Sequence, residues 1–347
     1  MTDRFIVEDM ENIRRKIDPV KIDGSRVLIS GATGLVGKYL VRFLAQYCDC
    51  KVIAVVRDLE KAQRIWSDLE GRVEYIHSDI TQLEAVNQSV DYMIHGASIT
   101  SSRSFQAQPA EVIYTSVEGT RRMLEFATKN PVKGFLFLST MEVYGAPLTE
   151  EKICETQGTN LDTMSARSSY PESKRLCEVL CAAYHSEYGI PARVLRLTQT
   201  FGPGVEYDDP RVFAEFARCA IEGRDIVLHT AGDTKRSYLY LADACTAILK
   251  VLTEGSDGEA YNAANESTYC SIREMAELVA AQAAGNRIKV RLELDEKVQK
   301  ERGYAPVLKM NLDTSKLQGI GWKAEAGLLQ MYERMIGYMR DSGSLQR

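Results

Sequence analysis

The sequence has no excess of basic residues and no long apolar run. Its 347 residues include 43 Lys and Arg against 48 Asp and Glu, which gives a formal net charge of −5. This balance offers no basic footprint for nucleic acid, so we expect no nucleic-acid partner. No apolar run reaches the roughly 18 residues that a membrane-spanning helix requires, so we expect no membrane association either.

Metal-binding and secretion signals are also lacking. The four histidines and eight cysteines are scattered, and no C-x-x-C pair occurs. We therefore expect no metal site, and we interpret the cysteines as reduced thiols of a cytoplasmic protein. The charged N-terminal stretch, MTDRFIVEDMENIRRK, has no apolar segment of the kind found in a signal peptide.

Short apolar runs alternate with helix-like stretches from Val27 onward. Amphipathic patterns such as those at 37–47 and 117–130 predict helices, whereas runs of Val, Ile, Leu and Phe predict buried strands. The predicted strands are 26–30, 51–56, 73–78, 91–97, 134–140 and 192–198. Strands that alternate with helices predict an α/β fold with a doubly wound parallel sheet.

A glycine-rich turn, GATGLVG, follows the first predicted strand and opens a helix. Gly31, Gly34 and Gly37 give the spacing G-x-x-G-x-x-G. Glycines permit the tight turn and let the backbone approach a pyrophosphate, which the helix N-terminus attracts with its unpaired N–H groups. This context predicts a dinucleotide site. Its expected residues are Gly31, Thr33, Gly34, Leu35, Val36 and Gly37.

The chain accordingly divides into three expected parts. Residues 5–17 predict an amphipathic helix, so residues 1–25 are expected to form a helical extension that covers the sheet edge or contacts a second copy. Residues 26–200 are expected to form a Rossmann dinucleotide-binding domain, to which some later segments return. The alternation then loosens, so we expect 201–347 to form a smaller, mainly substrate-binding domain at the carboxyl ends of the strands.

The end of the second predicted strand bears on which cofactor binds. The stretch VVRD places Arg57 there, with Asp58 next. An arginine accepts the 2′-phosphate of NADP, whereas an acid binds the ribose 2′-hydroxyl of NAD. Arg57 favours NADP, and NAD stays open because Asp58 lies beside it. Asp79 and Ile80 are expected to flank the adenine, and Ala97 ends the strand expected beneath the cofactor ribose.

The stretch YPESK at 170–174 has the spacing of a proton-transfer pair. Tyr170 and Lys174 are four residues apart, so a helix places them on one face. A tyrosine with a pKa of about 10 is a poor base near neutrality, but a neighbouring ammonium and a cationic nicotinamide favour its phenolate. Tyr170 is therefore the candidate base. Lys174 is expected to tune it and to bind the nicotinamide ribose.

The order of the motifs carries a resemblance. GATGLVG, STMEVYG, YPESK, RLTQTFGPG and GDTKRSYLYLAD follow one another as in extended short-chain dehydrogenases/reductases. Over residues 26–285 the chain resembles the NAD-dependent epimerase/dehydratase family, which acts on nucleotide sugars. The resemblance implies a homodimer, a nucleotide-diphosphate sugar as substrate, and transient oxidation of the sugar C4 by bound NAD(P).

The resemblance also implies roles for single residues. Tyr170 would take the proton of the sugar C4-hydroxyl, and Thr140 would hydrogen-bond the same oxygen. Arg236 matches the arginine that binds the substrate diphosphate, an anion that a planar guanidinium suits. Gln199 stands where the family often has an asparagine near the diphosphate, and Asn262 is expected to close the same pocket.

The stretch STMEVYG departs from the family's dehydratases. Those enzymes carry STDEVYG, in which the aspartate protonates the departing C6-hydroxyl and the glutamate abstracts the C5 proton. Here Glu142 is kept, but Met141 has no acidic proton to give. We therefore expect a redox-neutral epimerase or decarboxylase in which Glu142 enolises C5 or orients the substrate. A 4,6-dehydratase with a displaced acid and a net NADPH-dependent carbonyl reductase stay open as alternatives.

Overall fold

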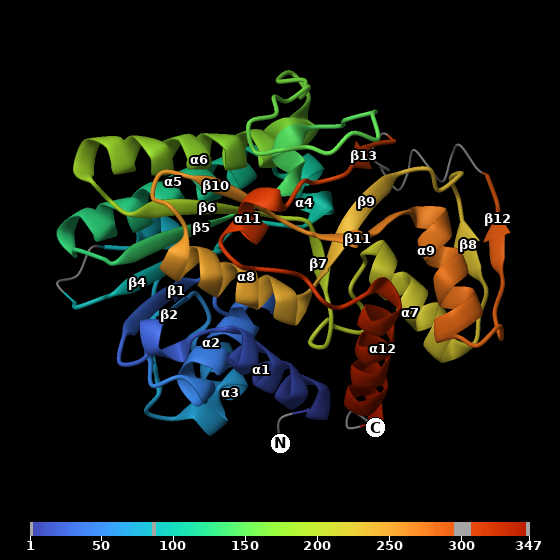
Figure 1. Cartoon of the computed structure of the whole chain (residues 1–347), viewed down its shortest axis with the longest axis horizontal. Coiled ribbons are helices and arrows are strands. Elements are labelled where there is room, and N and C mark those ends of the chain that lie inside the picture. Colours follow the sequence, from blue (N-terminus) through green and yellow to red (C-terminus); the bar gives the residue numbers. More distant parts are fainter. Residues whose placement is uncertain (1–2, 85–87, 295–306, 345–347) are drawn as a thin grey trace.

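The computed structural model describes residues 3–84, 88–294 and 307–344. A seven-stranded parallel sheet with the order β10-β6-β5-β4-β1-β2-β3 forms its centre (Figure 1). Its strands are β1 (Arg26–Ser30), β2 (Lys51–Val56), β3 (Val73–His77), β4 (Tyr92–His95), β5 (Gly134–Thr140), β6 (Ala192–Leu197) and β10 (Ala260–Ala263). The predicted α/β fold is confirmed, and all six predicted strands lie in this sheet. The strand order reverses between β1 and β4, which is where such folds bind ligands.

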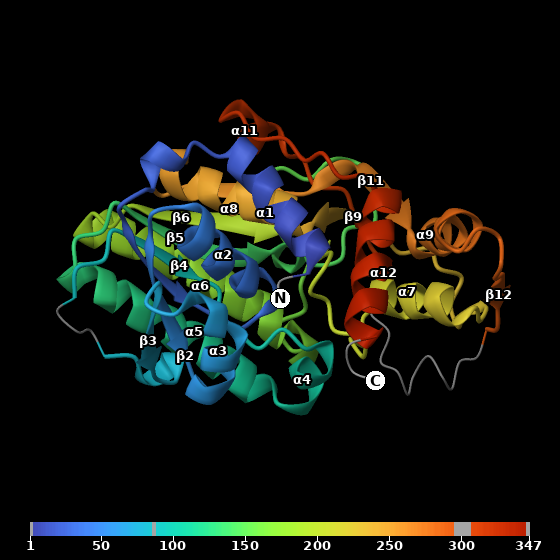
Figure 2. The same cartoon turned by 90° about the horizontal axis from the view of Figure 1, so that it is seen from below.

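Helices cover both faces of this sheet (Figures 1 and 2). One face carries α2 (Leu35–Tyr47), α3 (Leu59–Ile65) and α8 (Leu241–Glu254), and the other carries α4 (Ser102–Ala107), α5 (Pro109–Lys129) and α6 (Ser169–Tyr188). Each face has its own apolar core. In β1, Val27 and Ile29 join the first core and Leu28 the second, as the alternation of side chains along a strand requires.

The N-terminal extension forms α1 (Arg4–Lys16), which packs on α2, α8 and α12 (Leu328–Ser344). It therefore lies on the helical layer. The sequence pattern had instead suggested a position along the sheet edge or against a second copy. The reason is its apolar side, where Met10 and Ile13 join the core that α2 and α8 build. Whether the extension also contacts a second copy stays a prediction.

The residues after 200 build a second, smaller unit around a four-stranded sheet. Its strands are β7 (Gln199–Phe201), β9 (Lys235–Tyr240), β11 (Asn265–Ser271) and β13 (Lys309–Met310), and a separate pair joins β8 (Ile226–Leu228) to β12 (Val290–Leu292). Its helices are α7 (Val212–Glu222), α9 (Ile272–Leu278) and α12, whereas α11 (Ser315–Gly319) contacts β10 of the large sheet. Strand β10 and helix α8 return to the large sheet. The boundary near residue 200 stays a prediction.

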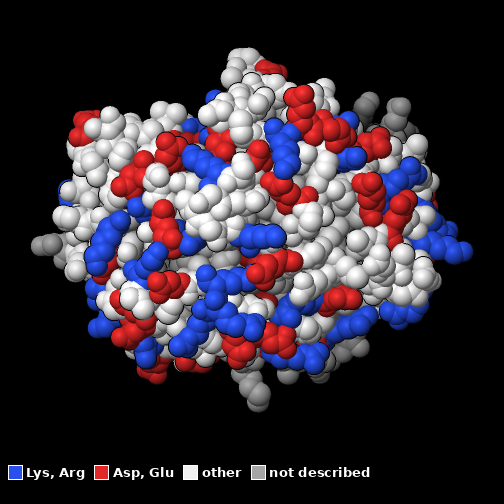
Figure 3. Space-filling model, in the orientation of Figure 1, with Lys and Arg blue, Asp and Glu red and all other residues white. Residues whose placement is uncertain are grey.

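The surface carries charges of both signs. On the face shown in Figure 3, Lys and Arg side chains lie interspersed with Asp and Glu, so this face presents no extended basic strip. Within the described ranges, none of the helices combines the length and the apolar character that crossing a membrane requires.

Candidate active site

The glycine-rich turn packs tightly between β1 and α2. Gly31 has a φ of 70°, and a side chain there would lie 2.6 Å from the carbonyl carbon of Gly96. A side chain at Gly37 would lie 2.6 Å from the carbonyl oxygen of Ala32. Glycine is therefore required at both positions, because any Cβ would push the helix away from the turn.

The first turn of α2 offers unpaired donors at this place. Gly34 is the N-cap of α2, and within the described residues no side chain caps the helix there. The N–H groups of the first turn, which begins at Leu35 and Val36, consequently lack helical partners and carry the positive end of the helix dipole. Thr33 is half-buried just before them. The predicted pyrophosphate cradle has the shape and donors that a dinucleotide requires.

At the end of β2, Arg57 and Asp58 differ in what they do. Asp58 is the N-cap of α3, where its side chain accepts a hydrogen bond from the Lys61 N–H at 2.8 Å. Arg57 is exposed, and its Nη1 lies 4.0 Å from Oδ2 of Asp79. Both side chains are exposed, and one carboxylate oxygen of Asp58 is engaged by the helix.

The remaining predicted cofactor residues lie at the ends of β3 and β4. Asp79 caps a short 3₁₀ turn, η3 (Ile80–Gln82), in which the side chain of Ile80 is buried against Gly119 of α5. The Ala97 N–H donates to Ser30 Oγ at 3.3 Å. These positions share the carboxyl edge of the sheet with the glycine-rich turn.

Helix α6 places Tyr170 and Lys174 one turn apart, and both are buried. The Tyr170 ring stacks on Phe105 of α4, with 4.3 Å between ring centroids and 8° between planes. The Lys174 Nζ donates to the Leu138 carbonyl oxygen at 2.8 Å and lies 6.0 Å from the centre of the Tyr170 ring. The pair is thus held at the end of β5, beside Thr140.

Burial and two nearby charges set the protonation of this pair. Burial raises the pKa of Tyr170 and the Glu142 carboxylate raises it further, whereas the Thr140 hydrogen bond and the Arg167 charge lower it. Burial also lowers the pKa of Lys174 to about 8. The charges that act on Tyr170 here are those of Glu142 and Arg167. Tuning by Lys174, which bonds a carbonyl oxygen, stays a prediction.

The residues after Thr140 enter a 3₁₀ turn, η4 (Met141–Tyr144), which sends neighbours in different directions. Met141 is buried in an apolar cluster with Met310 and Leu312. Glu142 stays half-exposed, where its Oε2 accepts a hydrogen bond from Arg167 Nη2 at 2.8 Å. The methionine is therefore a packing residue that joins β5 to the smaller unit, and the carboxylate is the group left at the site.

Arg236 and Gln199 come from neighbouring strands of the smaller sheet. In the described structure the Nε of Arg236 is buried without a hydrogen-bond partner. A buried N–H without a partner costs free energy until an acceptor arrives, so this guanidinium suits an anionic ligand. Gln199 is half-buried on β7, in register with Tyr238 of β9.

Asn262 lies deeper than its predicted role requires. It is fully buried on β10, and its Nδ2 donates to the carbonyl oxygens of Ile153 at 2.9 Å and Asp313 at 3.1 Å. Its Oδ1 accepts from the Tyr144 hydroxyl at 2.7 Å. The amide therefore fastens the 153–155 loop to the sheet, and a substrate contact by Asn262 stays a prediction that this geometry does not favour.

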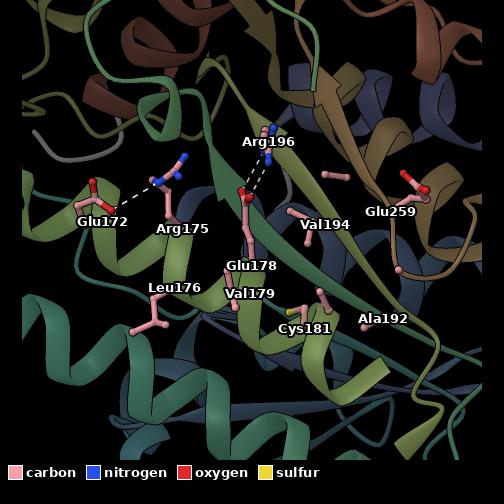
Figure 4. Close-up of a pocket in the computed structure, with 13 residues that line it drawn as sticks. Glu172, Arg175, Leu176, Glu178, Val179, Cys181, Ala192, Val194, Arg196 and Glu259 are labelled. Carbon is pink, nitrogen blue, oxygen red and sulfur yellow. Dashed lines mark hydrogen bonds and ion pairs between the residues drawn. The ribbon is translucent and has the colours of Figure 1, made fainter. Parts of the chain in front are cut away.

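A buried ion pair joins Glu178 of α6 to Arg196 of β6 (Figure 4). Arg196 of β6 donates to both carboxylate oxygens of Glu178, through Nε at 3.0 Å and Nη2 at 2.6 Å. Each side chain is 12% exposed. Glu178 also accepts from Ser139 Oγ at 2.5 Å, and Arg196 Nη1 donates to the Tyr144 hydroxyl at 2.7 Å. The pair links β5, η4 and α6, and it forms part of the wall of a cavity of about 520 Å³ beside α6 and β6.

Three residues of this neighbourhood were not among the predicted site residues. Arg167 lies in η5 (Ala166–Ser168), and its position just before Tyr170 was the one signal that could have pointed to it. Phe105 reaches Tyr170 from a helix far away in the chain, so no local pattern announces it. Glu178 lies one turn after Lys174 on the same helix, and that spacing could have suggested it.

A glycine-rich turn at the start of α2 and a Tyr–Lys pair on α6 thus lie at the carboxyl edge of one parallel sheet, and a smaller unit carries a partly buried arginine. This arrangement defines the class of extended short-chain dehydrogenases/reductases. The chain belongs to the NAD dependent epimerase/dehydratase family, whose model matches residues 27–264. The predicted resemblance is confirmed, and the protein is an enzyme of this family.

Curated relatives include UDP-glucuronic acid decarboxylases. The relative named UDP-glucuronic acid decarboxylase 3, from Arabidopsis thaliana, is 32% identical to this chain over 256 residues, which are 73% of each chain. UDP-glucuronic acid decarboxylase 1 from Xenopus tropicalis is 28% identical over 346 residues, covering 96% of this chain and 78% of the relative.

Solved structures share the fold. A UDP-glucose 4-epimerase from Thermotoga maritima, solved with UDP-glucose, is 22% identical, with a TM-score of 0.77 over 91% of this chain and 99% of the other. A dTDP-glucose 4,6-dehydratase from Streptomyces venezuelae, solved with NAD, is 22% identical, with a TM-score of 0.75 over 92% of this chain and 98% of the other.

Proposed function

We propose that the protein is a nucleotide-sugar decarboxylase that transiently oxidises C4 of a nucleoside-diphosphate hexuronic acid and releases its C6 carboxyl group as CO₂. The observation that carries the proposal is the set Thr140, Tyr170 and Lys174, together with a buried methionine where dehydratases have their acid. A 4-keto group turns the uronate into a β-keto acid, which loses CO₂ as the electron pair of the C5–C6 bond passes to the C4 oxygen. Water then protonates the resulting enolate at C5, so no proton donor is needed at position 141. The similarity to UDP-glucuronic acid decarboxylases supports this choice of substrate.

The residues of the site divide the work as follows. Tyr170 takes the C4-hydroxyl proton, and the Thr140 hydroxyl holds the same oxygen in place. Bound NAD(P) supplies the hydride acceptor at C4 and the hydride donor for the return step, so the reaction is redox-neutral overall. Lys174 holds the nicotinamide ribose in this proposal. Glu142 orients the sugar ring on its C5 side.

We further propose that Arg236 binds the substrate diphosphate. Its buried, unpartnered Nε supports this role, because a diphosphate oxygen would satisfy a donor that the protein leaves unpaired. Gln199, on the strand beside it, is the second candidate contact with the diphosphate.

The test offers UDP-glucuronic acid, UDP-glucose and dTDP-glucose to the purified protein with no added reductant and follows product masses. Loss of one CO₂ from UDP-glucuronic acid is the expected result, and the matched control is the Tyr170→Phe variant. A new sugar of unchanged mass would instead make the protein an epimerase, and loss of water a dehydratase. In a parallel assay with added NADPH, stoichiometric consumption of NADPH would make the protein a net reductase.

For the cofactor we propose NADP, with Arg57 as the residue that receives the 2′-phosphate. The support is that Arg57 is exposed at the end of β2, whereas Asp58 uses one carboxylate oxygen to cap α3. The family is NAD-dependent by description, so a direct comparison of the two cofactors decides the matter.

We also propose a homodimer formed through α5 and α6. Large apolar side chains are exposed on these two neighbouring helices, among them Tyr114 at 54%, Leu176 at 46% and Val179 at 61%. Apolar side chains gathered on one side of a molecule mark an association surface. A second copy that pairs the same helices would cover them.

A further inference from the structure

Arg167 stands beside the candidate base although it precedes α6. Its guanidinium carbon lies 4.8 Å from the centre of the Phe105 ring, and that ring stacks on Tyr170 with 4.3 Å between centroids. Cation, ring and phenol therefore form one column. The Nη2 of Arg167 also donates to Oε2 of Glu142 at 2.8 Å, which brings the carboxylate to the same place.

Stability does not explain this pair. The two side chains are 31% and 30% exposed, and ion pairs with this much access to water contribute little to stability. Within the described residues, the contacts of the Arg167 guanidinium are those with Glu142 and Phe105. This ion pair stabilises the fold little and lies at the edge of the candidate active site. We therefore look for a functional explanation of it.

The charges around Tyr170 supply this explanation. Glu142 faces it from η4, Arg167 from η5 and Lys174 from α6, while Phe105 of α4 and Val112 of α5 are apolar. Besides burial, the Glu142 carboxylate raises the pKa of the phenol, and Arg167 lowers it. The Glu142 carboxylate thus favours the protonated phenol, and Arg167 opposes that effect.

We propose, resting on the proposed function, that Arg167 is a positioning residue for the C4 oxidation. It holds Glu142 in an ion pair and sets a positive charge over the Phe105–Tyr170 stack, so that a carboxylate needed on the C5 side of the sugar does not hinder ionisation of the base on the C4 side. One cation thereby allows an acidic group and a phenolate to work in the same small site.

The test measures C4 oxidation alone, as the appearance of reduced nicotinamide in a single turnover with UDP-glucuronic acid, across a pH series. In Arg167→Gln we expect the rate at pH 7 to fall about tenfold, which is less than the roughly 10²–10⁴ that a general base itself contributes. The rate should recover as the pH rises. Arg167→Lys keeps the charge and should retain most of the rate. Arg42→Gln, which breaks a surface ion pair of the same 2.8 Å length on α2, is the matched control and should leave the profile unchanged.

The double variant Arg167→Gln/Glu142→Gln decides the mechanism. Glu142 moves no proton in the oxidation step, so removing both charges should bring the pH profile of that step back toward the wild type. A uniform loss at every pH in Arg167→Gln, or a double variant no better than the single one, would overturn the proposal.

Product analysis keeps this inference separate from the decarboxylase assignment. If UDP-glucuronic acid is oxidised but not decarboxylated, the proposed function is wrong. The pH profile of the oxidation step still tests the role of Arg167. If another nucleotide sugar proves to be the substrate, the same series with that sugar applies, because every C4 oxidation uses Tyr170. Oxidation of no nucleotide sugar by the wild type would overturn both.

Discussion

Tyr170 shows how one residue depends on its surroundings. Its burial would keep the phenol protonated, and the groups that lower its pKa are a hydroxyl on β5 and a guanidinium on η5. The proposed role of Tyr170 as a base therefore depends on groups that other elements bring to it.

Tyr170→Phe should abolish hydride transfer and leave the fold intact. Phenylalanine keeps the stacking on Phe105 and loses only the hydroxyl, and a general base contributes about 10²–10⁴ in rate. Single-turnover reduction of the bound cofactor measures the loss, with cofactor affinity and melting temperature as controls. Turnover close to the wild-type value would show that another group takes the proton.

Arg57→Asp should move cofactor preference from NADP toward NAD. The substitution removes a partner of the 2′-phosphate and supplies an acceptor for the ribose hydroxyl. A charged hydrogen bond contributes about 1.5–3 kcal/mol, so we expect NADP to bind roughly 10- to 100-fold more weakly. Titration of both cofactors into cofactor-free protein measures this. A wild type that already prefers NAD strongly would show that the interpretation of Arg57 is wrong.

At the scale of elements, the catalytic geometry depends on how β5, η4 and α6 are fastened together. The Arg196–Glu178 pair does this, since Glu178 holds Ser139 of β5 and Arg196 holds Tyr144 of η4. The Glu178 carboxylate also raises the pKa of Lys174, whereas burial lowers it.

Glu178→Ala should destabilise the protein by about 3–5 kcal/mol, because it leaves the Arg196 guanidinium buried without its carboxylate. Denaturant unfolding at fixed pH measures the change in the free energy of unfolding. The matched control is Glu172→Ala on the same helix, whose partner Arg175 lies 3.5 Å away and is well exposed. That variant should change stability by no more than about 1 kcal/mol. Equal effects of the two substitutions would contradict a special role of the buried pair.

At the scale of the whole molecule, one buried carboxylate joins both ends of the chain to the dinucleotide-binding unit. Asp9 of α1 accepts hydrogen bonds from Tyr39 of α2 at 3.0 Å, Tyr240 at 2.8 Å and Arg334 of α12 at 2.9 Å. Burial raises its pKa to about 6, in spite of these partners. The ionised form is therefore held in the fold at a cost.

This cost predicts a pH dependence of stability. The folded-state pKa of Asp9 lies above its unfolded value, so the fold favours the protonated carboxyl. The contribution of Asp9 to the free energy of unfolding is therefore fully present below about pH 4 and is lost as the pH rises through about 6. The change corresponds to about 3 kcal/mol. Asp9→Asn cannot titrate, so the stability of the wild type relative to this variant should fall between pH 4 and 7. Unfolding free energies at several pH values measure it.

The control for this experiment is Glu8→Gln, which alters the more exposed carboxylate that also pairs with Arg334. It should keep the wild-type pH dependence. If Asp9→Asn and the wild type lose stability in parallel, Asp9 is not the titrating group.

Val179→Arg should convert the proposed dimer to monomers, because it places a charge in the centre of the exposed apolar surface on α5 and α6. Sedimentation equilibrium measures the mass in solution. Val227→Arg, at an exposed position on β8, is the matched control and should leave the mass unchanged. A wild-type protein that sediments as a monomer at all concentrations would refute the proposed assembly.

The sequence by itself determined the features that depend on neighbours along the chain. The runs of branched apolar residues set the six strands, the glycine spacing set the turn at the start of α2, and the four-residue interval put Tyr170 and Lys174 on one side of a helix. These features follow from local steric and periodic constraints, so they can be recognised in the sequence without the tertiary structure.

Only the tertiary structure decided which distant groups meet. Phe105 and Glu142 come to Tyr170 from other elements, Met141 is drawn into the apolar cluster of the smaller unit, and Asn262 uses its amide to hold a loop. Helix α1 lies on α2 and α8 because its apolar side finds their core there. Such contacts depend on how the layers pack, and packing between residues far apart in the chain leaves no local pattern in the sequence.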